Sequence, residues 1–138
     1  MAAVNTQFSI GIHILVAIGS AGCSMTSTEL AASVNAYPSF VRRILSKLAK
    51  AGLIKTSKGK GGCCTLSRKA SEITLLEVYR AVEAPKAFAI HAYPVEKRCK
   101  VSHGIKSCLS KVLDQAQRAL EESLDRTTLA SVMGDFSK

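Results

Sequence analysis

The fold is decided by residues 26–67, which read TSTELAASVNAYPSFVRRILSKLAKAGLIKTSKGKGGCCTLS. A capping box opens this stretch, because the Thr26 hydroxyl can accept from the Glu29 amide while the Glu29 carboxylate reaches back. The apolar pattern that follows the box is short. We therefore expect a first short helix that ends near Val34, followed by a turn at residues 35–37.

A second helix is predicted from Pro38 to about Lys50. Proline suits the first position of a helix, and Gly52 is a natural left-handed cap at the other end. The apolar stripe of this helix contains Val41, Ile44, Leu45 and Leu48. The residues outside the stripe are Ser39, Arg42, Arg43, Ser46, Lys47 and Lys50. One helix thus carries a buried face and a separate basic face.

A hairpin follows this helix. Residues 53–57 are predicted as one strand and residues 65–67 as its return, around a glycine-rich tip that carries Lys58 and Lys60. A short helix, a turn, a basic helix and a basic hairpin occur in this order in winged helix-turn-helix proteins. The predicted fold is therefore mainly α, with a winged helix-turn-helix domain and a two-stranded wing.

The net charge of the 138-residue chain is +9 and is concentrated in this stretch. Nine basic residues and no acidic residue lie between Pro38 and Ala70, and elsewhere basic and acidic residues cancel. Such a block attracts a polyanion to one face. The alternative is a solvated face that keeps the protein soluble, although residues of both signs would serve that purpose.

Helices are expected on both sides of this stretch. Residues 6–19 are predicted to form a first helix that is apolar on two faces, which indicates packing against the core and against a partner chain. A second capping box, formed by Thr74 and Glu77, opens a helix expected to run to about Glu83. We therefore place the winged-helix domain at residues 1–83.

The C-terminal part divides into a loop and a long helix. Residues 84–104 are predicted to be an irregular sensor or effector loop, because long loops in compact proteins are often functional. A helix from about Ile105 to Asp125 would span about 30 Å, which is more than so small a domain can cover. We therefore assign residues 105–138 to a dimerisation helix and tail, with a short helix at 128–133. The alternative is that the long helix folds back on its own domain.

Three pieces of sequence recur in the order and spacing of a known family. They are LSKLAKAGLI at 45–54, the glycine-rich wing, and ITLLEVYRAVE at 73–83. In these pieces the chain resembles the Rrf family of bacterial transcriptional regulators, and the resemblance covers nearly the whole chain. The segment IGIHILVAI at 10–18, with His91 and Cys99, is closest to the YwnA-like branch. The resemblance implies a homodimer that binds a roughly palindromic operator in double-stranded DNA and acts as a repressor.

In such a domain, the N-terminal part of the basic helix enters the major groove. The side chains expected to reach base edges are Ser39, Phe40, Arg42 and Arg43. Lys47 and Lys50 are expected to meet phosphates, which position a protein without specifying sequence. In the family, an arginine before the first wing glycine reaches the minor groove. Lys58 stands at that position here and lacks the planar fork of arginine, and Lys60 adds a second cation to the wing.

The resemblance also raises the question of an iron–sulfur cluster, which family members often hold with three cysteines before the long helix. This chain has two cysteines there, Cys99 and Cys108. A cluster would need further ligands, such as His103 and a partner chain's His13. No cofactor is therefore expected, with the cluster kept as the alternative, and no other metal site is predicted.

A thiol switch is a second interpretation of the same residues. Arg98 and Lys100 flank Cys99, and neighbouring positive charge favours the reactive thiolate. Cys108 is expected at the start of the long helix, where the helix dipole acts in the same direction. Oxidised Cys99 would be resolved by Cys108 or by a cysteine of the other subunit. The alternatives are two ordinary small apolar residues, or a regulator whose loop binds a small ligand near His91 and Tyr93.

The remaining signals narrow the function class and the compartment. We find no nucleophile–base pair, paired carboxylates or P-loop, so the chain is not expected to be an enzyme. No secretory signal or membrane-length apolar run is visible, so a cytoplasmic protein without membrane contact is expected, with reduced cysteines. A protein-interaction adaptor that does not bind DNA remains the alternative, and the one-sided basic block disfavours it.

Overall fold

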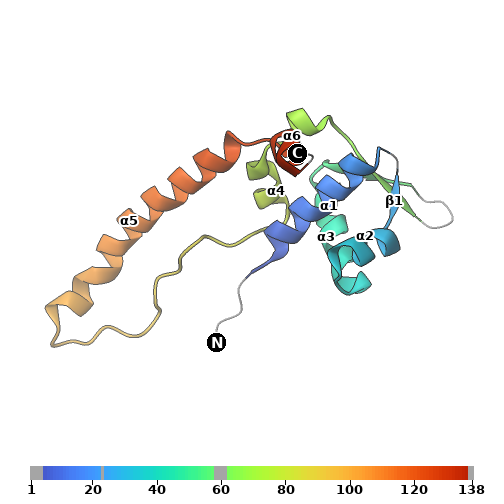
Figure 1. Ribbon diagram of the computed structural model, residues 1–138. Helices are drawn as coiled ribbons and strands as arrows, with labels where there is room; N and C mark the ends of the chain where they lie inside the picture. Colours follow the sequence, from blue (N-terminus) through green and yellow to red (C-terminus); the bar gives the residue numbers. More distant parts are fainter. Residues whose placement is uncertain (1–4, 23, 58–61, 137–138) are drawn as a thin grey trace. The chain divides into compact units, whose positions relative to one another are not determined.

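The computed structural model describes residues 5–22, 24–57 and 62–136, and the side chain of Phe136 lies outside that description (Figure 1). The predicted wing cations Lys58 and Lys60, and Cys23, lie outside the described residues. The elements are α1 (Gln7–Ala21), β1 (Met25–Thr26), α2 (Ser27–Val34), α3 (Pro38–Lys50), β2 (Ile54–Thr56), β3 (Cys63–Leu66), the 3-10 helix η1 (Ala70–Glu72), α4 (Leu75–Ala81), α5 (Lys100–Asp125) and α6 (Leu129–Phe136). They form two compact units, residues 85–123 and the remainder of the chain.

The local signals of the helix-turn-helix are confirmed. The Thr26 hydroxyl accepts from the Glu29 amide at 3.1 Å, and the Glu29 carboxylate accepts from the Thr26 amide at 3.3 Å. Pro38 begins α3. Gly52 follows the end of α3 with a φ of +79°, and the Leu53 amide donates to the Leu48 carbonyl at 3.0 Å, as in a Schellman motif.

The predicted two-stranded wing is present as the hairpin of β2 and β3, and a third strand that was not predicted, β1, extends the sheet in the order β1-β3-β2. Strand β3 pairs with β2 through Ile54 and Leu66, and with β1 through Met25 and Cys64. The extra strand follows from the helix cap. A capping residue has an extended backbone, and Thr26 has φ −82° and ψ 160°, so the residues before α2 are ready to join a sheet.

The first unit has a closed apolar core beneath the helix-turn-helix. Its fully buried side chains come from α1, α2, α3 and α4 and from the residues just before β2 and α4, and the largest are Ile14, Leu15, Leu30, Ile44, Leu48, Leu53 and Ile73. Leu129 of α6 completes this core, and its amide donates to the Ile73 carbonyl at 2.8 Å. Residues from Leu124 onward therefore belong to the winged-helix unit, and not to a tail of the long helix as the predicted boundaries had it.

Helix α4 keeps only half of the predicted second capping box. The Thr74 hydroxyl accepts from the Glu77 amide at 3.2 Å, whereas the Glu77 carboxylate binds Arg68. The helix ends at Ala81, two residues earlier than predicted, and Glu83 follows with a φ of +56°. The Glu77 carboxylate thus pairs with the Arg68 guanidinium in place of the predicted contact with the Thr74 amide.

The second unit contains an irregular segment and most of α5. No helix or strand lies between residues 85 and 99, as the sequence predicts. Helix α5 begins at Lys100, five residues before the predicted start, and the Cys99 sulfur accepts from the Ser102 amide at 3.4 Å at this end. Within the described residues, no helix is long and apolar enough to span a membrane.

Candidate nucleic-acid interface

The outer face of α3 is cationic and open. Arg42, Arg43 and Lys50 are exposed there beside Ser39 and Ser46, while the opposite face of the helix lies in the core. Helix α3 carries no acidic residue. The Arg43 guanidinium lies over the ring of Phe40, 5.7 Å from its centroid, in a cation–π contact. Two of the predicted base-contacting side chains are therefore held together near the beginning of the helix.

Lys47 differs from the other cations of α3. Its side chain is half-buried, and its ammonium donates to Gln7 Oε1 at 3.0 Å and reaches the Val82 carbonyl oxygen at 3.5 Å. These contacts join α3 to the beginning of α1 and to the end of α4. The sequence prediction placed Lys47 against a phosphate. The hydrogen bonds in the structure favour a role in packing instead.

At the base of the wing, one cation of the predicted basic block, Arg68, is paired with a carboxylate. Arg68 forms a forked ion pair with Glu77, at 2.6 and 3.3 Å, and donates to the Glu72 carbonyl at 3.3 Å. Its charge is therefore partly offset within the unit. Lys55 on β2 and Lys69 are exposed and extend the cationic surface beyond α3.

Sequence reasoning missed Tyr37. This residue caps the N-terminus of α3, and 82% of its surface is exposed. The sequence placed it only in a turn before Pro38. The signal available from the sequence was an aromatic residue in the turn directly before the basic helix, whereas its exposure is known only from the structure.

The two sensor cysteines lie in one unit but are not adjacent. Cys99 lies directly before α5, half-buried, and Cys108 is exposed within α5. Nine residues of helix separate them by about 13 Å along the axis, which is far beyond the Cα distance of a disulfide. The predicted resolution of Cys99 by Cys108 of the same chain is therefore wrong for this conformation. The predicted dipole effect on Cys108 is also wrong, because that effect fades within the first turn.

The candidate ligands of an iron–sulfur cluster do not form a set. The His103 ring nitrogen is 3.0 Å from the Lys97 carbonyl oxygen, and the His13 ring nitrogen is 3.0 Å from the Ser33 hydroxyl. In the part of the chain that the structure describes, no three His, Cys, Asp or Glu side chains are placed to hold a metal ion. The described donors of a single chain therefore do not fit a cluster.

The wing cysteines are of a different kind. Cys64 is buried in β3. Burial raises the pKa of the Cys64 thiol, and the neighbouring Cys63 raises that pKa further. Cys64 thus packs as a neutral apolar residue, and we assign it no reactive role.

The comparisons with known proteins agree with this geometry. Residues 4–135 match the Rrf2 family model, which is described as an iron-dependent transcriptional regulator. YwnA of Bacillus subtilis, named as a candidate HTH-type transcriptional regulator, is 38% identical over 132 residues, covering 94% of this chain and 96% of its own.

Solved structures give the same result for the fold. A crystal structure titled as a candidate DNA-binding protein is 34% identical, with a TM-score of 0.73, and the match covers 92% of this chain and 98% of that chain. A candidate transcriptional regulator from Lactobacillus plantarum is 23% identical, with a TM-score of 0.81, and the match covers 96% of this chain and 90% of that chain. The winged helix, the cationic face of α3 and the match over nearly the entire chain lead to one conclusion: the chain belongs to the Rrf2 family of DNA-binding transcriptional regulators.

Proposed function

We propose that the chain represses transcription as a homodimer that reads a palindromic operator through the exposed face of α3. The observation that carries the proposal is the separation on α3 of a fully buried apolar stripe from an outer face with cations and no carboxylates. A helix of this kind can enter the major groove with its first turns against the base edges.

The side chains of this face take different roles. Arg42 and Arg43 are suited to guanine, because a guanidinium can donate two parallel hydrogen bonds to one base. Tyr37 and Phe40 offer apolar surface to a thymine methyl group. Lys50 and Lys55 are placed for phosphate contacts, which fix the register and make binding depend on salt. We propose that Lys58 and Lys60 of the wing contact the sugar-phosphate wall of the adjacent groove. Lys47 is not proposed to contact DNA.

The second copy of the chain is proposed to pack on α5. This helix has 26 residues, and Gln117 is its one buried residue. An apolar stripe along it consists of Val101, Ile105, Cys108, Val112 and Ala116. Ile105 is half-buried, whereas the others are exposed, Val101 and Val112 by 66% and 58%. The successive spacings are four, three, four and four residues, close to those of helices that pair along a seam. Two-fold pairing of such helices would duplicate the α3 surface, which suits a palindromic operator.

For the signal, we propose that the Cys99 thiol responds to a peroxide. Its thiolate would attack one peroxide oxygen, forming a sulfenic acid and releasing hydroxide. Cys99 lies at the start of α5, and its sulfur already accepts a backbone amide at 3.4 Å. Oxidation there would disturb the beginning of α5, and a cysteine of the second subunit would have to supply any disulfide partner.

The test is operator binding by a matched pair of variants. An operator is first selected from random duplexes with the full-length protein, and affinity is then measured by fluorescence anisotropy. Arg43→Ala should weaken binding by about 1–3 kcal/mol and relax specificity at one position. Arg118→Ala removes the same charge from an exposed position of α5 and should change affinity little. Equal losses in both variants, or none in Arg43→Ala, would contradict the proposed face.

A further inference from the structure

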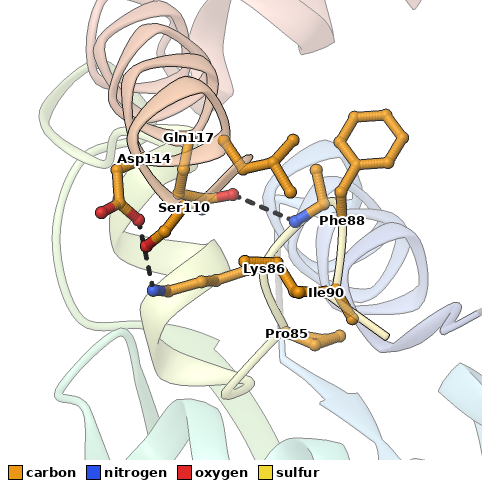
Figure 2. A pocket seen from close by; sticks show the side chains of 10 residues that line it. Pro85, Lys86, Phe88, Ile90, Ser110, Asp114 and Gln117 are labelled. Atoms are coloured by element: carbon orange, nitrogen blue, oxygen red, sulfur yellow. Dashed lines mark hydrogen bonds and ion pairs between the residues drawn. The ribbon is translucent and has the colours of Figure 1, made fainter. Parts of the chain in front are cut away.

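The second unit has an open cavity, bordered partly by exposed side chains, that neither the DNA contacts nor the thiol uses. Residues 85–90 form one wall, α5 forms the other, and the volume is about 310 Å³ (Figure 2). Phe88 and Ile90 line the cavity from the irregular segment, and Leu113 lines it from α5. This volume lies at the lower end of the range for small-molecule sites.

Gln117 holds the irregular segment against α5. It is the one buried polar residue of the described chain, and its side-chain oxygen accepts from the Ala87 amide at 3.0 Å (Figure 2). A buried polar side chain is unfavourable unless it is hydrogen-bonded, and an apolar residue would pack at this position without that requirement. The hydrogen bond fixes the backbone of the segment, so the cavity has a defined wall.

Opposite charges lie at the edge of the same cavity. The Lys86 ammonium is 3.9 Å from the Asp114 carboxylate, which is too long for a direct hydrogen bond, and the two side chains are 72% and 59% exposed. A pair this loose and exposed adds little to folding stability. Both groups thus keep hydrogen-bonding capacity for a ligand, and their separation matches the two charges of one small zwitterion.

We propose that this cavity binds a free α-amino acid with an apolar side chain. The ligand carboxylate meets the Lys86 ammonium, the ligand ammonium meets the Asp114 carboxylate, and the ligand side chain packs on Phe88, Ile90 and Leu113. A lone carboxylic acid would leave Asp114 facing a like charge, and a lone amine would do the same at Lys86. The zwitterion is the small ligand that satisfies both groups and the apolar wall. This inference is independent of the proposed DNA face, and either can fail alone.

The experiment is isothermal titration of the full-length protein with L-leucine, L-methionine and L-phenylalanine. At least one of them should bind saturably at millimolar concentrations or below. 4-Methylpentanoate and 3-methylbutylamine lack the ammonium and the carboxylate of leucine, respectively, and each should bind at least about tenfold more weakly than the amino acid. Absence of saturable binding by all three amino acids would overturn the proposal, and so would analogues that bind as well as they do.

Variants separate this site from other sources of binding. Lys86→Gln and Asp114→Asn should each weaken amino-acid binding about tenfold, and Leu113→Trp should abolish it by filling the cavity. Lys111→Gln changes an exposed charge on the same helix and should leave binding unchanged. Circular dichroism melting establishes that each variant is folded. If the cavity holds a second copy of the chain instead, Leu113→Trp will shift the dimer equilibrium without any amino-acid binding in the wild type, which overturns the proposal.

Discussion

The two units of this molecule differ in what their apolar side chains do. In the winged-helix unit, apolar residues from α1, α2, α3, β2, β3, α4 and α6 are buried against one another. In residues 85–123, the one buried residue is the polar Gln117, while Phe88, Val101 and Val112 are among the large apolar side chains left exposed. The first unit therefore contains its own stabilising core. The second leaves large apolar side chains exposed, and for this reason we propose that assembly and signalling belong to it and DNA reading to the first.

The largest expected effect comes from the core of the winged-helix unit. Leu48→Ala removes a fully buried side chain from the inner face of α3. The free energy of unfolding should fall by about 2–5 kcal/mol, because burial is lost and a cavity remains. Urea denaturation monitored by circular dichroism measures this change. A loss below about 1 kcal/mol would mean that the α3 core is not packed as described.

The next effect concerns the α5 stripe. Val112→Asp places a charge in the proposed helix pair and should weaken dimerisation by about 2 kcal/mol or more, with a folded winged-helix unit retained. Sedimentation velocity over a range of protein concentrations measures the shift. Ser107→Asp adds the same charge to an exposed position of α5 outside the stripe and should leave the dimer intact. If both variants dissociate alike, charge repulsion and not the stripe explains the result.

The next effect is smaller and contrasts two lysines of α3, Lys50 and Lys47, in operator affinity and in folding stability. Lys50→Ala should reduce operator affinity a few-fold and lower the salt slope by about one, with unchanged stability, because an exposed phosphate contact is lost. Lys47→Met should lower the free energy of unfolding by about 1 kcal/mol through the lost bonds to Gln7 and Val82, with the salt slope kept. The opposite pattern in anisotropy and urea titrations would restore the original assignment of Lys47 to a phosphate.

The smallest expected effect is a difference among the cysteines in their rate of reaction with a thiol reagent, measured on the folded protein. Exposed Cys108 should react first with a thiol reagent, half-buried Cys99 and Cys63 later, and Cys64 only on unfolding. The raised pKa of Cys64 keeps it protonated as pH rises into the range where exposed thiols ionise, so alkaline pH should widen the difference. Mass spectrometry of alkylated peptides over time reports the order. Early labelling of Cys64 would show that β3 opens readily.

The parts predicted from sequence are those that local chemistry determines. The Thr26–Glu29 box, Pro38 and Gly52 set the limits of α2 and α3 through contacts within a few residues, and the structure confirms them. The alternation of apolar and basic residues along α3 likewise predicted its two faces. The long helix was also predicted and ends where expected, although its start was placed five residues late.

The parts that sequence could not supply depend on contacts between distant residues. Strand β1 exists because it pairs with β3, some forty residues later in the chain. The Glu77 carboxylate pairs with Arg68 and not with the backbone of its own capping box. The Lys47 ammonium donates to Gln7, forty residues away, and not to a phosphate as predicted. In each case the contact is with a residue far away in the sequence, and the pattern of nearby residues does not determine which distant partner is contacted.

The central claim is that DNA is read by the outer face of α3, and hydrogen exchange with mass spectrometry tests it most directly. The full-length protein is measured with and without a saturating selected operator. We expect slower amide exchange in peptides that cover residues 37–43 and the wing strands, with little change across Val101–Ala116. Protection confined to α5, with unchanged exchange in α3, would contradict the account.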